Sequence, residues 1–285
     1  MDIRPYSSAI GAEVDGVDLS RPLSTEVTAA VHAALLDHHV LFFRDQELTP
    51  KQHVQFSRQL GELESYPFSD GLHGEPEIVE IVKLPDEYVN FGSGWHVDMS
   101  FNPSSPDGAA LYAKEIPQSG GDTLFCNLTV AFEMLSDGYR ELLERMHGVH
   151  DSDVDYDGTF ELKGMRMKSE YQRVFTVHPL IRVHPETGQR SLFISPDYFY
   201  KLDGMTRAES KTFLEFLETH ATRYEFTCRF RWSPRALVLW DNRCIMHRAI
   251  EDDLGARRAG KGFKRVLHRT TFKRFFTDAE LAASG

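Results

Sequence analysis

Hydrophobic and polar residues alternate in the C-terminal third of the chain, which is the pattern of strands with one buried face. In residues 224–232, aromatic side chains and one cysteine occupy every second position, and charged or hydroxyl residues lie between them. Residues 236–240 are apolar throughout, which predicts a strand buried on both faces. Alternation returns in residues 265–272. These segments predict a β-sheet region.

Capping signals predict three helices around these strands. The first covers residues 26–38, with Ser24 as its candidate cap, and leads into an apolar run at 40–43, which predicts a buried strand. Thr49 begins the second helix with a capping box and a proline at the first helical position. Thr206 begins the third helix with another capping box. One face of this third helix carries Phe213, Phe216, Leu217 and His220.

The order of these elements favours a β-sandwich or barrel decorated by helices over a regular βαβ repeat. No repeat of 20–50 residues and no low-complexity tract interrupts the 285 residues. A chain of this length suits one large domain or two small ones. We expect a single domain over residues 1–285.

Charge and cysteine content restrict the partners and the compartment. The chain has 32 Lys and Arg against 43 Asp and Glu, a net charge of −11, so nucleic acid and membrane surfaces are not expected partners. This charge still allows a small anionic molecule as a partner if a few arginines converge in a pocket. It does not exclude a homo-oligomer. The three cysteines lack CxxC spacing, which together with the absence of a signal-like apolar segment predicts a cytoplasmic protein.

A His-x-Asp pair is the first candidate for metal chemistry. His96 and Asp98 lie two apart in the strand-like residues 94–101, so both side chains project from one face. The spacing alone is weak evidence, because the chain contains two similar pairs beside Gly or Pro in turns, which we interpret as solvated loops. These are His73 with Glu75, and His184 with Glu186.

The surroundings of His96 and a distant histidine strengthen the metal hypothesis. The neighbours of His96 are apolar, and a buried ionised Asp98 is costly without a cation or hydrogen-bond donors. A hydrogen-bonded His–Asp pair bracing the core explains this segment equally well. His247 follows the predicted buried strand, and two histidines with one carboxylate form the facial triad that suits iron(II) and O₂. Structural zinc would need a fourth ligand.

Two arginines are candidates for anchoring a co-substrate. Oxygen chemistry at such a site needs two further electrons, which a 2-oxoacid can supply by decarboxylation, and its far carboxylate then needs an anchor. Arg265 and Arg269 face the same way in an alternating strand, roughly 13 Å apart, and arginine binds carboxylates in bidentate fashion. The alternative is a pair of surface arginines matched to acids such as Glu251 or Asp253.

Four motifs together resemble one known family. Residues 11–19, 120–125, 240–243 and 265–269 are similar, in order, to the taurine/chlorophenoxyacetate (TauD/TfdA) family of iron(II)- and 2-oxoglutarate-dependent dioxygenases. The resemblance implies a mainly β fold with flanking helices, a double-stranded β-helix (cupin-like jelly roll). It implies Fe(II), 2-oxoglutarate and O₂ as cofactors. The implied iron ligands are His96, Asp98 and His247; Thr123 and Arg265 would hold the distal carboxylate of 2-oxoglutarate, and Arg269 would lie near the oxoacid and the substrate anion.

The same resemblance bears on the reaction and the substrate. A carboxylate at Asp98 implies hydroxylation rather than halogenation, with C–O, C–N or C–S cleavage where the attacked carbon carries a leaving group. Tyr66, Ser69 and Gly92 depart from the pattern of taurine dioxygenases, which argues against taurine. We expect Tyr66 and Phe68 to line a small-anion substrate pocket, with loop packing as their alternative role.

Two further hypotheses keep the same residues but differ in function. One is a catalytically silent jelly-roll protein that binds a small anion. The other is a zinc or manganese hydrolase or isomerase that uses the three ligands.

Overall fold

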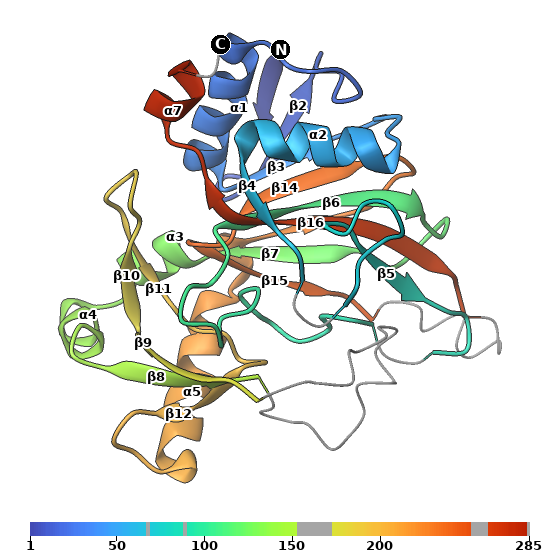
Figure 1. Ribbon diagram of the computed structural model, residues 1–285. Helices are drawn as coiled ribbons and strands as arrows, with labels where there is room; N and C mark the ends of the chain where they lie inside the picture. The colour runs from blue at the N-terminus through green and yellow to red at the C-terminus, as the bar shows by residue number, and fades with distance from the viewer. Residues whose placement is uncertain (67–68, 88–89, 153–172, 252–261, 284–285) are drawn as a thin grey trace.

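Two antiparallel sheets form the centre of the computed structural model, which describes residues 1–66, 69–87, 90–152, 173–251 and 262–283 (Figure 1). Seven strands of the large sheet are, in order, β1 (Asp2–Pro5), β2 (Ala12–Asp15), β3 (Val40–Phe43), β14 (Leu237–Asp241), β6 (Gly108–Glu115), β16 (Arg265–Phe275) and β4 (Gly61–Glu64). The eighth strand, β5 (Val79–Lys83), also pairs with β16, and within this sheet only β2 and β3 run parallel. The small sheet contains β13 (Thr227–Phe230), β7 (Thr123–Asn127) and β15 (Ile245–Ala249).

An apolar core fills the space between the two sheets. Phe42 and Trp240 from the large sheet pack with Phe125 and Phe230 from the small one, and all four are buried. The rings of Phe42 and Phe230 stack with centroids 4.3 Å apart. This face-to-face packing is the jelly-roll arrangement, so the predicted fold class is confirmed; the sheets remain open rather than closed into a barrel.

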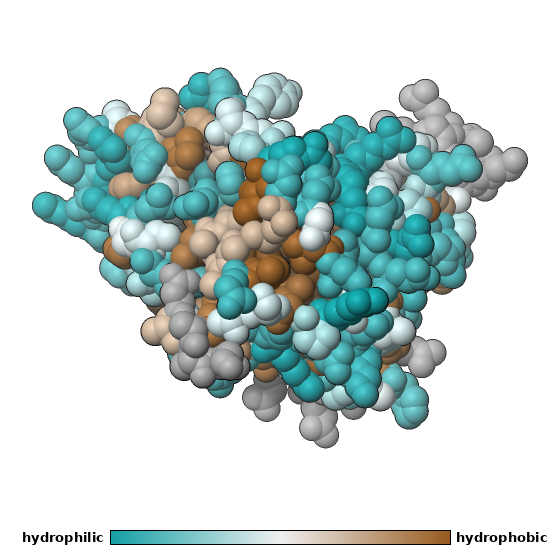
Figure 2. Space-filling model, turned by 90° about the horizontal axis from the view of Figure 1, so that it is seen from above, coloured by the Kyte–Doolittle hydropathy of each residue, from teal (hydrophilic) through white to brown (hydrophobic). Residues whose placement is uncertain are grey.

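Helices α1 (Thr25–His38), α2 (Pro50–Leu60) and α7 (Asp278–Ala283) cover the outer face of the large sheet (Figure 1). The predicted caps are present: Ser24 accepts a hydrogen bond from the Val27 N–H, and Thr49 forms a full capping box. Under these helices lies a second apolar core. Seen from this side, hydrophobic side chains at the centre of the face are surrounded by hydrophilic ones (Figure 2).

A third layer covers the other face of the small sheet. Its core joins Trp95 and Val97 to Cys126 and Met246, so these four side chains point away from the space between the sheets. The elements of this layer are α3 (Leu128–Glu133), α4 (Asp137–Leu143), β8 (His147–Asp151), β9 (Phe175–Pro179), β10 (Ile181–Val183), β11 (Arg190–Leu192), β12 (Phe199–Leu202) and α5 (Arg207–Ala221). In the part of the chain that the structure describes, no helix is both long and apolar enough to cross a membrane.

Two predictions from local pattern were wrong in part. The alternation over residues 224–232 begins with a 3₁₀ turn, η2 (Tyr224–Phe226), and Tyr224 is 95% exposed. This turn forms because the chain leaves α5 and the Thr227 N–H bonds back to the Tyr224 carbonyl. Phe216, which was predicted to share one face of α5 with Leu217, is exposed and packs on Tyr139 at the surface, whereas Leu217 is buried.

His184 was predicted to lie in a solvated loop, and this is also wrong. Its side chain is buried, and the Nε2–H donates to Asp241 Oδ2 at 3.0 Å because Nδ1 accepts backbone N–H groups from Glu186 and Thr187. The hairpin of β10 and β11 folds against the turn between β14 and β15, which a local turn signal does not reveal.

Candidate active site

His96 and His247 are brought together by backbone pairing. The N–H of each residue donates to the carbonyl of the other, at 3.0 and 2.9 Å, which makes an isolated antiparallel bridge between His96 and β15. The strand predicted over residues 94–101 is therefore wrong beyond this bridge, since residues 98–101 form turns. The imidazole centroids are 4.3 Å apart. Since Trp95 and Val97 point into the third layer, His96 and Asp98 project to the opposite side, between the two sheets.

The three side chains present their ligand atoms to one point. Asp98 Oδ1 lies 3.6 Å from His96 Nε2 and 4.0 Å from His247 Nε2, and the three ligand atoms all lie within 4.8 Å of one another. All three residues are buried. Asp98 Oδ2 has no hydrogen-bond partner among the described residues. Two imidazoles and a buried carboxylate with an unsatisfied oxygen fit a divalent metal ion with open coordination positions.

The protonation states of these ligands also suit a metal ion. His96 Nδ1 lies 2.8 Å from the Gly94 carbonyl, which only accepts, so Nδ1 carries the hydrogen and Nε2 is available as a ligand. Burial, with a contribution from His96, lowers the pKa of His247 to about 3. Burial alone would raise the pKa of Asp98, but Arg269 and the two imidazoles outweigh it and hold that pKa below its ordinary value. His247 is therefore a neutral imidazole and Asp98 a carboxylate at neutral pH, which are the forms that bind a metal ion.

A second group of potential ligands, His184, Asp241 and Cys244, has a structural explanation. Arg243 donates from Nε to Asp241 Oδ1 at 2.8 Å and from Nη2 to Oδ2 at 2.6 Å. The carboxylate is thus already neutralised by a bidentate guanidinium, and a cation placed there would face that positive charge. We interpret this group as a buried polar network that fixes the turn before β15.

A cavity beside the two histidines contains the predicted co-substrate residues. Thr123, Arg265 and Arg269 line it together with His96 and His247. Both arginines are buried, so the alternative of surface arginines on an exposed strand is wrong. The remaining lining residues are Ile81, Phe91, Gly92, Leu111, Trp240, Ala249 and Leu267.

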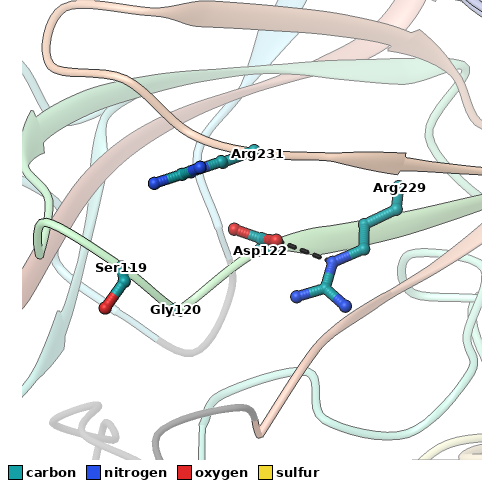
Figure 3. Close-up of a pocket in the computed structure, with 5 residues that line it drawn as sticks. All are labelled: Ser119, Gly120, Asp122, Arg229 and Arg231. Carbon is teal, nitrogen blue, oxygen red and sulfur yellow. Dashed lines mark hydrogen bonds and ion pairs between the residues drawn. The ribbon is translucent and has the colours of Figure 1, made fainter.

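The turn that precedes Thr123 is fixed on both sides. Arg229 Nε from β13 donates to Asp122 Oδ2 at 2.7 Å, whereas Arg231 lies over the turn at Gly120 (Figure 3). The Ile250 N–H donates to the Asp122 carbonyl at 2.8 Å. Gly121 has a φ of +74°, and a Cβ there would lie 3.2 Å from Cδ of Arg265, so a glycine suits both the backbone conformation and the close approach of the arginine.

Arg269 lies between Asp98 and a group of aromatic residues. Its Nη1 donates to Asp98 Oδ1 at 3.1 Å, and its guanidinium lies 5.0 Å from the ring centroid of Tyr66 and 5.9 Å from that of Phe91. Tyr66, a predicted substrate residue, is buried there, and burial raises its pKa to about 12. The other predicted substrate residue, Phe68, lies outside the described residues.

Two aromatic residues of this group were missed from the sequence. Tyr198 lies with its ring 6.3 Å from the His96 ring and 5.0 Å from the Phe101 ring. Tyr198 and Phe101 pack in one apolar cluster, whose other members are Tyr66, Val79, Ile81, Phe91, Met99 and Val174. Tyr198 is 102 residues from His96, so no local pattern links them.

Asn242 was also missed as a residue of the site. Its Oδ1 accepts the Asp98 N–H at 2.9 Å, and its Nδ2 donates to the Asp98 carbonyl at 3.1 Å and to the Pro106 carbonyl at 2.9 Å. The side-chain amide thus takes the place of a partner strand for the backbone of Asp98. The sequence offered one signal, an Asn directly after a buried strand and five residues before His247.

Residues 2–271 match the family described as "Taurine catabolism dioxygenase TauD, TfdA family". The chain belongs to this family. It is a 2-oxoglutarate-dependent dioxygenase, and the enzymes of this type use iron(II), 2-oxoglutarate and O₂. The resemblance noted in the sequence is confirmed.

Relatives of this TauD/TfdA family member include enzymes and solved structures of similar length. An alpha-ketoglutarate-dependent sulfate ester dioxygenase from Pseudomonas putida is 32% identical over 259 residues, which cover 88% of this chain and 85% of the relative. The crystal structure of a taurine dioxygenase from Burkholderia xenovorans has a TM-score of 0.79 and 36% identity, covering 99% of this chain and 98% of that one. The crystal structure of AAD-2 in complex with Mn(II) and N-oxalylglycine has a TM-score of 0.77 and 26% identity, covering 97% of both chains.

Proposed function

We propose that His96, Asp98 and His247 hold the iron(II) ion, and that Thr123 and Arg265 hold the distal carboxylate of 2-oxoglutarate. The convergence of three buried ligand atoms supports the first assignment. The burial of a permanently charged arginine in the adjoining cavity supports the second. Bound there, iron(II) with 2-oxoglutarate supplies an oxidation by O₂ that releases succinate and CO₂.

The substrate that we propose is an organic anion with a hydrophobic body, specifically an alkyl sulfate ester. The observation that carries this proposal is the aromatic group beside Arg269, because it offers an apolar wall next to one buried positive charge. The Tyr66 hydroxyl is neutral, so it adds no negative charge that would repel the anion. The relative from Pseudomonas putida is named for activity on sulfate esters.

Gly92 argues against a compact zwitterion such as taurine. A Cβ at this position would lie 2.9 Å from Cε1 of His96, and the φ of +72° favours glycine. A side chain that could bind an ammonium group is therefore absent at the position where the resemblance places an Asn in taurine dioxygenases.

The proposed reaction is hydroxylation followed by cleavage. One oxygen atom of O₂ is inserted into a C–H bond of the carbon that carries the ester oxygen, and the other enters succinate. The product carries a hydroxyl and a sulfate on the same carbon, so it breaks into an aldehyde and inorganic sulfate. Arg269 would hold the sulfate group, and the aromatic residues would hold the hydrocarbon part in place.

An anaerobic titration and a substrate panel test this proposal. Iron(II) plus 2-oxoglutarate should give a visible metal-to-ligand charge-transfer band, which Asp98→Ala should abolish. A silent binding protein or a zinc enzyme predicts no band. Octyl sulfate should accelerate O₂ uptake and release sulfate more efficiently than taurine or phenoxyacetate. Faster turnover of taurine would contradict the proposed substrate class while leaving the metal assignment intact.

We also propose that the whole chain, residues 1–285, forms one catalytic domain located in the cytoplasm. The family match over residues 2–271 supports the first point. The three cysteines are free, which is compatible with a reducing compartment.

A further inference from the structure

The indole of Trp232 is directed at the hydroxyl of Thr123. Trp232 follows β13 and is buried, and its Nε1–H donates to Thr123 Oγ1 at 3.0 Å. An indole nitrogen only donates hydrogen bonds, so the threonine oxygen must be the acceptor in this contact. The hydrogen of the Thr123 hydroxyl is therefore available for another acceptor, and in the described part of the chain no residue takes it.

The direction of this contact is fixed by packing. The Trp232 ring lies edge-to-face on Phe230, with centroids 5.1 Å apart and an interplanar angle of 85°. Both rings belong to the core between the two sheets. Thr123 is the first residue of β7, pairs with Phe230 across the ladder, and lines the same cavity as Arg265. The threonine acceptor thus begins a strand that pairs with β13, and the indole donor lies two residues beyond the end of β13.

We propose that Trp232 is a positioning residue that orients the Thr123 hydroxyl so that its hydrogen points to the distal carboxylate of 2-oxoglutarate. This inference rests on the proposed function, in which Thr123 and Arg265 bind that carboxylate. With the indole N–H on one lone pair of the oxygen, the hydroxyl binds the carboxylate as an oriented donor. Trp232 thereby contributes to the selection of 2-oxoacids that carry a second carboxylate.

A purely structural role for the indole predicts a different result. A buried N–H needs some acceptor, and Thr123 would serve as one without any effect on ligands. In that case, loss of the N–H would lower stability and leave the preference between a dicarboxylic and a monocarboxylic 2-oxoacid unchanged. The two roles therefore separate on ligand discrimination.

Calorimetric titration of the anaerobic Mn(II)-loaded protein provides the test, with 2-oxoglutarate and 2-oxopentanoate as ligands. These acids share a five-carbon chain, and only the first has a distal carboxylate. Trp232→Phe keeps an aromatic ring and removes the donor, so we expect the Kd for 2-oxoglutarate to rise about 3- to 10-fold, with that for 2-oxopentanoate unchanged. Thr123→Val should have at least this effect, and the double variant should bind no more weakly than Thr123→Val alone.

A matched control is available on the other side of the large sheet. The buried Tyr112 hydroxyl donates to the Gln46 carbonyl at 2.9 Å and accepts the Leu48 N–H at 3.2 Å, and its side chain belongs to the core under α1 and α2 rather than to the cavity lining. Tyr112→Phe should lower stability and leave both Kd values unchanged. If Trp232→Phe does not fold, Trp232→benzothienylalanine retains the two-ring shape without the N–H and tests the same contact.

The outcomes distinguish the inference from the function beneath it. If Thr123→Val weakens 2-oxoglutarate binding but removal of the indole N–H does not change discrimination, the role of Trp232 is refuted and the proposed function stands. Additive losses in the double variant would also refute it, because they would show that the two groups act independently. If Thr123→Val leaves binding of 2-oxoglutarate unchanged, the assignment of Thr123 fails, and the inference fails with it.

Discussion

Replacement of Asn242 by alanine should weaken metal binding without touching a metal ligand. The substitution removes three hydrogen bonds and leaves the Asp98 N–H, the Asp98 carbonyl and the Pro106 carbonyl without their partners inside the protein. At about 1 kcal/mol for each bond, the free energy of unfolding should fall by about 3 kcal/mol. Because the lost bonds hold the backbone of Asp98, metal affinity should also fall, about 10- to 100-fold.

Asn127 provides the matched control for this prediction. It is equally buried, and its side chain also makes three hydrogen bonds, accepting the N–H groups of Thr129 and Val130 and donating to the Ala9 carbonyl. Asn127→Ala should lose a similar amount of stability, because it removes the cap of α3. None of its bonds reaches a metal ligand, so its metal affinity should remain that of the parent protein.

Two measurements separate a specific effect of Asn242 on metal binding from a general loss of stability. Urea unfolding of the metal-free proteins gives the free energies, and anaerobic calorimetric titration with Mn(II) gives the affinities. The reasoning is refuted if Asn242→Ala binds Mn(II) as tightly as the parent, or if Asn127→Ala loses affinity to the same degree.

Three more substitutions address the site, the titration behaviour and the polar network. Gly92→Ala should weaken Mn(II) binding about 10-fold or more, because a Cβ there would lie 2.9 Å from the His96 ring; unchanged affinity in a calorimetric titration would contradict this. Burial, with a contribution from a neighbouring histidine, lowers the pKa of His53 to about 3, so the folded protein keeps it neutral and stability is lost as the pH falls below about 6.5. Between pH 6.5 and 5, urea unfolding of the parent should therefore show about 1.5 kcal/mol more loss than His53→Asn, and equal losses would exclude this contribution. Asp241→Asn should cost on the order of 3 kcal/mol of unfolding free energy, because it removes the charge of the carboxylate that binds the buried guanidinium of Arg243 in bidentate fashion and leaves only the pairs of Arg243 Nη1 with Glu186 and Asp107; a loss below about 1 kcal/mol would show that the pair is dispensable.

Local signals in the sequence predicted the elements whose formation depends on neighbours in the chain. The caps at Ser24, Thr49 and Thr206 were confirmed because a capping hydrogen bond joins residues three apart. The all-apolar run of β14 was confirmed because a strand paired on both edges and covered on both faces leaves no room for polar side chains. The 3₁₀ turn at Tyr224 escaped prediction, since its alternation is indistinguishable from that of the strand that follows.

The candidate site also contains residues that the sequence predicts from their chemistry and residues that only the folded contacts reveal. The three proposed ligands could be named from the sequence because few residue types bind iron(II), and the structure brings these three side chains together. Asn242 and Trp232 were not, because an amide bonded to a backbone or an indole bonded to a hydroxyl leaves no spacing rule in the chain. The burial of His184 depends on which segment packs against its turn, and that is a property of the whole fold.

Because His96 and His247 pair through their backbones, the positions of their imidazoles depend on the register between the two segments. A shift of one residue in the His96 segment or in β15 would turn the imidazole of that segment out of the interior, so an insertion or deletion within residues 96–98 or between Asn242 and His247 should disrupt the site. The loops in the long stretch that joins these two segments carry no such restriction, whereas β7 and β14 within it must keep their own pairing. Variants that retain the metal site should therefore vary freely in loop length outside the two segments and not at all inside them.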